Sequence, residues 1–124
     1  MKGSFQNQFE HEYKSWQSDL ELFRQKNVLL KYRLSETVDN NEGNHFLQMA
    51  EYFQNELLLK DEDLKKLISN VREFLIELSE IKNKKEFKNE WIQKREKMRK
   101  NILIFKKEFL NLSNEFNKRM AQKN

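Results

Sequence analysis

The stretch LELFRQKNVLLKYRL, residues 20–34, carries the pattern that decides the fold. Successive apolar residues on one of its faces are separated by three, seven and four positions, a spacing typical of one side of an α-helix. These residues are Leu20, Phe23, Leu30 and Leu34. Asn27 fills the slot in the seven-residue gap where this spacing requires an apolar side chain. The stretch therefore predicts a packed helix with one amide on its buried face.

The same spacing of three and four runs through most of the chain, in three segments. The first stripe consists of Phe9, Tyr13, Trp16, Leu20, Phe23, Asn27, Leu30, Leu34 and Thr37. The second consists of Phe46, Ala50, Phe53, Leu57, Lys60, Leu64, Leu67, Val71, Phe74, Leu78 and Ile81. The third, less regular, consists of Phe87, Trp91, Met98, Ile102, Phe105, Phe109, Leu112, Phe116 and Met120. Strand-like alternation does not extend over a comparable length, so the sequence predicts an all-α fold.

The composition permits long helices. The chain has 124 residues, enough for a single domain over residues 1–124. It contains no proline and only two glycines, so nothing in the periodic segments breaks a helix. The absence of cysteine excludes disulfides, thiolate metal sites and a cysteine nucleophile.

Two breaks separate the helical segments. The sequence VDNNEGNH, residues 38–45, is rich in turn residues, and we expect Gly43 to adopt a left-handed conformation and Asn44 to cap the next helix. A second turn is expected near residues 82–84, where Asn83 and Glu86 have the spacing of a capping box. The stripe runs unbroken through KDEDLKK, residues 60–66, so we predict a continuous second helix there.

The predicted fold is an elongated antiparallel three-helix bundle with coiled-coil-like packing. Its helices are expected at about residues 5–38, 44–81 and 84–121. Short connections force neighbouring helices to run antiparallel. In architecture and length this outline resembles a spectrin-type repeat, including a tryptophan, Trp16, in the first helix.

No catalytic or metal-binding pattern emerges from the sequence. A glycine-rich phosphate loop, a nucleophile elbow and a credible catalytic triad are all missing. His45 ends a Glu-x-x-His match that falls in the turn, and His11 lacks an acid three positions before it. We therefore expect a protein that is not an enzyme and that has no metal, no cofactor and no small-molecule substrate.

The apolar runs are too short to cross a membrane, and the first residues lack the apolar core of a signal peptide. The longest runs are LLL at residues 57–59 and ILIF at residues 102–105. We expect a cytoplasmic protein that does not act at a membrane.

Charge is distributed unevenly along the chain. Residues 1–81 contain 10 basic and 15 acidic residues, whereas residues 82–124 contain 14 basic and 5 acidic ones. Five cations form a basic ridge beside the third stripe. They are Lys84, Lys88, Arg95, Arg99 and Lys106.

The basic ridge has two interpretations. It is a possible track for the phosphates of a nucleic acid or another polyanion. The favoured interpretation is that carboxylates of the acidic second helix neutralise it within the bundle. The carboxylates available for this pairing are Glu51, Glu56, Glu73, Glu77 and Glu80.

Apolar residues outside the stripes indicate an interface. Leu22 and Leu29 lie almost opposite the first stripe, with Tyr32 to one side, so they cannot easily share its core. Further apolar residues off the second and third stripes are Leu47, Leu58, Ile76, Ile92, Leu103 and Leu110. An apolar patch that extends along a helix usually marks an interface, so we expect a homodimer or a protein partner.

Asn27 has two interpretations in such a molecule. It can pair with Asn27 of a second copy and so specify register, as buried asparagines do in coiled coils. Alternatively it faces the second helix near Leu57 and forms a polar layer with Lys60; this intramolecular contact is the one we expect. The functional expectation is a non-enzymatic helical interaction or scaffold module, and the alternative is a nucleic-acid-binding protein that uses the basic ridge.

Overall fold

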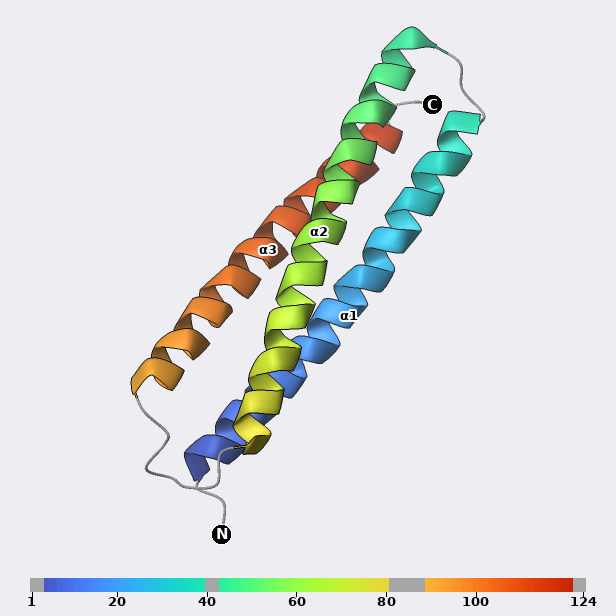
Figure 1. The fold of residues 1–124 in the computed structure, drawn as a ribbon. Coiled ribbons are helices and arrows are strands. Elements are labelled where there is room, and N and C mark those ends of the chain that lie inside the picture. The colour runs from blue at the N-terminus through green and yellow to red at the C-terminus, as the bar shows by residue number, and fades with distance from the viewer. Residues whose placement is uncertain (1–3, 40–42, 81–88, 122–124) are drawn as a thin grey trace.

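The computed structural model describes residues 4–39, 43–80 and 89–121, and these residues form three α-helices. Helix α1 spans Ser4–Asp39, α2 spans Asn44–Glu80 and α3 spans Asn89–Ala121. Figure 1 shows them side by side in an elongated bundle, with α2 antiparallel to both α1 and α3. The predicted all-α three-helix bundle is confirmed. The first two helices end within one residue of their predicted bounds, whereas the expected turn at 82–84 lies outside the described residues.

The predicted stripes form the core. Almost every described stripe residue is buried or packs against buried neighbours, because only these faces can leave water together. The buried residues of α1 are Phe9, Tyr13, Trp16, Leu20, Asn27, Leu30 and Leu34. Those of α2 are Phe46, Ala50, Phe53, Leu57, Leu64, Leu67, Val71, Phe74 and Leu78. Those of α3 are Ile102, Phe105, Phe109, Leu112 and Phe116.

Helices α1 and α2 pack closely, whereas aromatic side chains fill the wider space to α3. The ring of Phe23 meets those of Phe105 and Phe109 edge to face, with centroids 5.7 and 5.2 Å apart. Near the start of α3, the ring of Phe74 lies 4.8 Å from that of Trp91. Such ring pairs add to the free energy gained by burying their area.

Tyr13 is the largest fully buried side chain. Its ring stacks on that of Phe74 with centroids 4.3 Å apart and meets Trp16 edge to face. Its hydroxyl has no hydrogen-bond partner among the described residues. Burial raises the pKa of Tyr13, because the ionised phenolate is disfavoured away from water.

A polar layer interrupts the apolar contact between α1 and α2. Asn27 is fully buried, and its Nδ2 donates to the carbonyl of Leu57 at 3.0 Å and to Oδ1 of Asp61 at 2.7 Å. The other oxygen of Asp61 accepts from Nζ of Lys31 at 2.5 Å. Asn27 therefore meets its own chain, at the height expected.

The partner within this layer differs from the expectation. Asn27 binds Asp61, whereas the ammonium of Lys60 lies 3.4 Å from the carboxylate of Glu108 on α3. One step along a helix turns the side-chain direction by about 100°, so neighbouring residues of α2 face different helices. Sequence periodicity predicted the correct height on α2, but it did not predict which residue of α2 faces Asn27.

Helix α2 continues without interruption through residues 60–66, as predicted. The start of this helix differs by one residue from the expected cap. The N–H of Leu47 donates to the carbonyl of Gly43 at 2.9 Å, so Gly43 holds the capping position and Asn44 is already helical. Gly43 does not have a positive φ, so the expected left-handed conformation is wrong. Glycine serves at this position because it tolerates the backbone conformation that opens a helix.

Candidate protein interface on helix α1

Leu22, Leu29 and Tyr32 project from the outer face of α1. Their side chains are 49%, 61% and 63% exposed, whereas Leu20 and Leu30 on the same helix are buried. The bundle core is complete without the three exposed residues, because α1 already buries a separate stripe. The apolar residues proposed as an interface thus lie on a face that the bundle itself does not cover.

Two leucines of α3 lie beside this face. The ammonium of Lys106 contacts the carboxylate of Asp19 at 3.1 Å and thereby marks where α1 and α3 meet. Leu22 follows Asp19 by three positions, and Leu110 follows Lys106 by four, so the two leucines lie at similar heights on parallel helices. Leu103 precedes Lys106 by three positions. The side chains of Leu103 and Leu110 are 55% and 59% exposed. Sequence periodicity predicted that these two leucines point away from the buried face of α3. It did not predict that they lie on the side of α3 that borders α1.

The described part of the basic ridge is engaged with carboxylates of α1. Nε of Arg95 donates to Glu12 at 2.5 Å, and the guanidinium of Arg99 contacts the same carboxylate at 3.0 Å. Lys106 pairs with Asp19. Lys84 and Lys88 lie outside the described residues.

The acids that neutralise the ridge differ from the expected ones. They come from α1, whereas the expectation placed them on α2. Of the five α2 glutamates proposed, Glu77 is found near a cation of α3, at 3.9 Å from Lys94. The physical reason is the position of the ridge, which follows the edge of α3 that turns toward α1.

The carboxylate of Glu12 is held in its charged form. Partial burial alone would raise its pKa, but the hydrogen bonds from Arg95 and Arg99 outweigh that effect and lower the pKa of Glu12 below its ordinary value. Arg95 also lies over the ring of Phe9, with the guanidinium carbon 4.5 Å from the ring centroid. These contacts tie the first half of α3 to α1.

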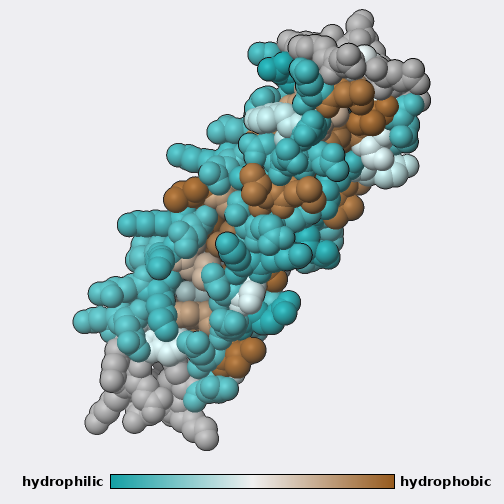
Figure 2. Space-filling view, turned by 45° about the horizontal axis from the view of Figure 1, so that its top comes forward, coloured by the Kyte–Doolittle hydropathy of each residue, from teal (hydrophilic) through white to brown (hydrophobic). Residues whose placement is uncertain are grey.

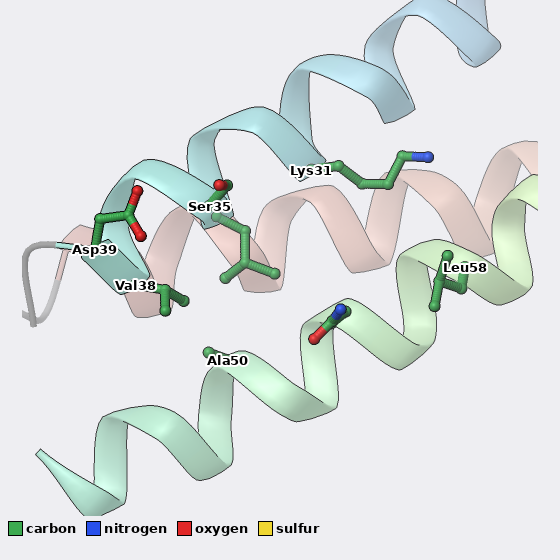
Figure 3. Close-up of a pocket in the computed structure, with 8 residues that line it drawn as sticks. Lys31, Ser35, Val38, Asp39, Ala50 and Leu58 are labelled. Atoms are coloured by element: carbon green, nitrogen blue, oxygen red, sulfur yellow. The ribbon is translucent and has the colours of Figure 1, made fainter. Parts of the chain in front are cut away.

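A groove of about 290 Å³ separates the end of α1 from the start of α2. Figure 3 shows Ser35, Val38 and Asp39 on its α1 side, and Ala50 and Leu58 on its α2 side. The small side chain of Ala50 leaves this space. The remaining lining residues are Lys31, Leu34 and Gln54. The volume of the groove is just below the roughly 300–1,000 Å³ of typical ligand pockets.

The described residues do not assemble a cluster of three His, Asp or Glu side chains able to hold a metal ion. His11 lies exposed on the outer face of α1. A search for membrane-spanning segments among the described helices finds none of sufficient length and hydropathy. Figure 2 shows the apolar side chains of one face as separate patches among hydrophilic ones.

No protein-family model, curated protein or solved structure matches the chain.

Proposed function

We propose that this protein is a non-enzymatic helical interaction module that presents the outer face of α1 for self-association or to a protein partner. One observation carries the proposal: Leu22, Leu29 and Tyr32 stay 49%, 61% and 63% exposed on a helix whose buried face is already complete. We place the module in the cytoplasm, on the sequence grounds given above.

Physical chemistry supports an interface role for these residues. Removal of apolar surface from water contributes roughly 25 cal/mol per Å², so an apolar row along a helix favours association. Tyrosine is also enriched at interfaces, because its ring packs while its hydroxyl finds a polar partner. On the parallel helix α3, Leu110 lies at the height of Leu22 and is also exposed.

The proposal is tested by the solution mass of the chain. The variant Leu22→Gln/Leu29→Gln/Tyr32→Gln removes the apolar row, and light scattering over a range of concentrations reports association. We expect the wild-type mass to rise above the 15.3 kDa of one chain, and the variant to stay at that mass. The matched control, Leu59→Gln/Ile76→Gln/Ile104→Gln, changes three equally exposed residues on α2 and α3 and should behave as the wild type.

A heterologous partner gives a different result in the same design. The wild-type chain would stay monomeric but retain a cellular protein that the α1 variant loses, and the purified protein would then bind the purified wild-type chain. A monomeric wild type whose binding to every protein equals that of the α1 variant would contradict the proposal.

Polyanion binding through the basic ridge remains the alternative function. It receives less support, because Arg95, Arg99 and Lys106 each contact a carboxylate of α1. A titration with DNA and RNA at increasing salt separates the two functions. Affinity that falls steeply with salt and is lost on charge reversal of Arg95 and Arg99 would favour the alternative.

A further inference from the structure

The outer face of α1 carries a second stripe of side chains, here called the uncharged stripe. Its members are Gln8, His11, Ser15, Ser18, Leu22, Gln25, Leu29 and Tyr32. All of them are exposed, and none is charged when histidine is neutral, although 35% of the chain is Asp, Glu, Lys or Arg. Charged residues are depleted at the centres of protein interfaces. This composition indicates a face that is covered by another protein.

The outer faces of the other helices differ. Helix α2 exposes Glu51 and Lys65, and α3 exposes Lys97, Lys100 and Lys107. Helix α1 itself exposes Lys14, Arg24 and Lys26 beside the stripe, so the absence of charge is a property of this one stripe.

We propose that a second copy of this chain covers the uncharged stripe, with the two α1 helices antiparallel. This inference rests on the proposed function and names the partner and its orientation. The stripe advances by three, four, three, four, three, four and three residues, a series that is the same in both directions. A two-fold axis at the height of Leu20, the centre of the stripe, therefore brings the stripe onto itself, as an isologous interface requires.

The antiparallel arrangement sets a larger side chain against serine in two of its four pairs. With the axis at Leu20, the opposed residues of the two copies are Leu22 with Ser18, Gln25 with Ser15, Leu29 with His11 and Tyr32 with Gln8. Side chains of unequal size interdigitate, as in a packed core. A parallel pair would set Ser15 and Ser18 against themselves and leave half of the stripe without apolar contact.

The surface of α1 is hollowed where the antiparallel pair needs space. A shallow depression is lined on its α1 side by Gln17, Ser18, Glu21, Leu22 and Gln25, three of which belong to the stripe. Ile68 and Arg72 of α2 form its far side. Leu22 of the second copy, opposite Ser18, enters this depression as a knob enters a hole.

Charge at the edges of the stripe does not oppose the pairing. The two carboxylates nearest the axis, Asp19 and Glu21, would approach their counterparts in the second copy. Glu21 is already bound by Arg24 of its own chain at 2.5 Å, and Asp19 by Lys106 at 3.1 Å. Each copy thus brings paired rather than bare charges to the axis.

The size of the interface predicts a weak dimer. From Gln8 to Tyr32 the stripe is about 36 Å long, and a helix is about 10 Å wide, so two copies bury roughly 700 Å². Standard interfaces bury at least about 1,200 Å², so we expect association in the micromolar range or weaker.

Cross-linking tests the orientation, because the chain has no cysteine of its own. Ser15→Cys and Gln25→Cys variants, one carrying a size tag, are oxidised separately and as a mixture. In the antiparallel dimer Ser15 of one copy faces Gln25 of the other, so the mixture should form the mixed disulfide. Each variant alone should not cross-link, because its two cysteines lie about 15 Å apart along the axis, beyond the ~7 Å limit of a disulfide. Asn55→Cys, on the outer face of α2, measures collisional cross-linking.

A size exchange tests the fit at Ser18. Ser18→Leu places Leu against Leu, and Leu22→Ser places Ser against Ser, so each single change should abolish the dimer mass in light scattering. The double variant Ser18→Leu/Leu22→Ser restores a large residue opposite a small one and should recover the dimer. Circular dichroism confirms that the helices are unchanged, as expected for exposed positions.

The outcomes separate this inference from the proposed function. Self-cross-linking of Ser15→Cys above the Asn55→Cys control would show a parallel pair, which overturns the inference and leaves the interface on α1. A chain that stays monomeric at millimolar concentration and forms no mixed disulfide also overturns it. The proposed function then depends on the comparison with the Leu22/Leu29/Tyr32 variant described above.

Discussion

The side-chain amide of Asn27 donates a 2.7 Å hydrogen bond to Asp61, and this bond joins α1 to α2 inside an otherwise apolar contact. The carboxylate of Asp61 is held from its other side by Lys31. Oδ1 of Asn27 is buried with no hydrogen-bond partner among the described residues. The NH2 group of this amide is therefore hydrogen-bonded, whereas its oxygen is not. Such a layer fixes which residues of two helices lie level while adding little net stability.

Replacement of Asn27 by Leu should leave the free energy of unfolding unchanged or raise it by about 1 kcal/mol, because it removes a buried unpaired oxygen and adds an apolar contact. Asp61 keeps Lys31 as a partner in this variant. Urea denaturation measures the effect, and Asn27→Asp serves as the contrasting variant, since it sets two carboxylates together and should lower stability by roughly 2–4 kcal/mol. A loss of several kcal/mol in Asn27→Leu would show that the amide is an essential hydrogen-bonding group.

The ion pairs of Glu12 predict a pH dependence of stability. Because its pKa is lowered in the folded state, Glu12 contributes stability above its unfolded pKa, near 4.5, and this contribution is lost as the pH falls through the lower folded value. Glu12→Gln lacks the contribution at every pH. Thermal unfolding between neutral and acidic pH should therefore show a smaller fall for Glu12→Gln than for the wild type. An equal fall in the unfolding temperature of the two proteins would contradict the ion pairs assigned to Glu12.

Removal of the buried hydroxyl of Tyr13 should not destabilise the fold. Tyr13→Phe keeps the ring stacked on Phe74 and deletes a buried polar group that has no hydrogen-bond partner among the described residues. We expect the free energy of unfolding to stay equal or to rise by up to about 1 kcal/mol in chemical denaturation. A fall of that size would reveal a hydrogen-bond partner for the hydroxyl.

The raised pKa of Tyr13 has a consequence at alkaline pH. The folded state keeps this phenol protonated, so its contribution to stability is complete below the ordinary tyrosine pKa of about 10 and is lost as the pH rises above it. Tyr13→Phe should therefore resist alkaline unfolding better than the wild type. In a spectroscopic titration, Tyr13 should ionise only as the chain unfolds. Ionisation of Tyr13 before the chain unfolds would be inconsistent with its burial.

Two leucines of α2 should differ sharply in their contribution to stability. Leu64 is 1% exposed and Leu59 is 56% exposed, and only five positions separate them. Leu64→Ala leaves a cavity in the core and should cost about 2–5 kcal/mol, whereas Leu59→Ala should change stability by less than about 0.5 kcal/mol. Equal losses in denaturant titrations would mean that the outer face of α2 is also covered.

Sequence periodicity correctly identified the core. The spacing of three and four is a property of the α-helix itself, so it names the buried face without knowledge of the neighbours. This is why Phe53 and Phe109 were placed inside and Leu22 and Leu29 outside. Their role as an interface remains a prediction.

Contacts between helices were harder to derive. The antiparallel pairing gave the height at which Asn27 meets α2, but the choice between Lys60 and Asp61 depends on a rotation of about 100°. Helix α2 begins at Asn44 as predicted, but Gly43 rather than Asn44 caps it, because glycine and asparagine both open helices well.

The chain by itself determined three amphipathic helices and the faces that they bury, because these follow from local geometry and from the removal of apolar side chains from water. Tertiary structure alone decided that the cations of α3 pair with Glu12 and Asp19 of α1 and that Leu110 lies at the height of Leu22. In a bundle of three helices each one borders both others. The handedness of the bundle decides which flank of a helix contacts which neighbour. The spacing of apolar residues along the sequence does not determine this handedness.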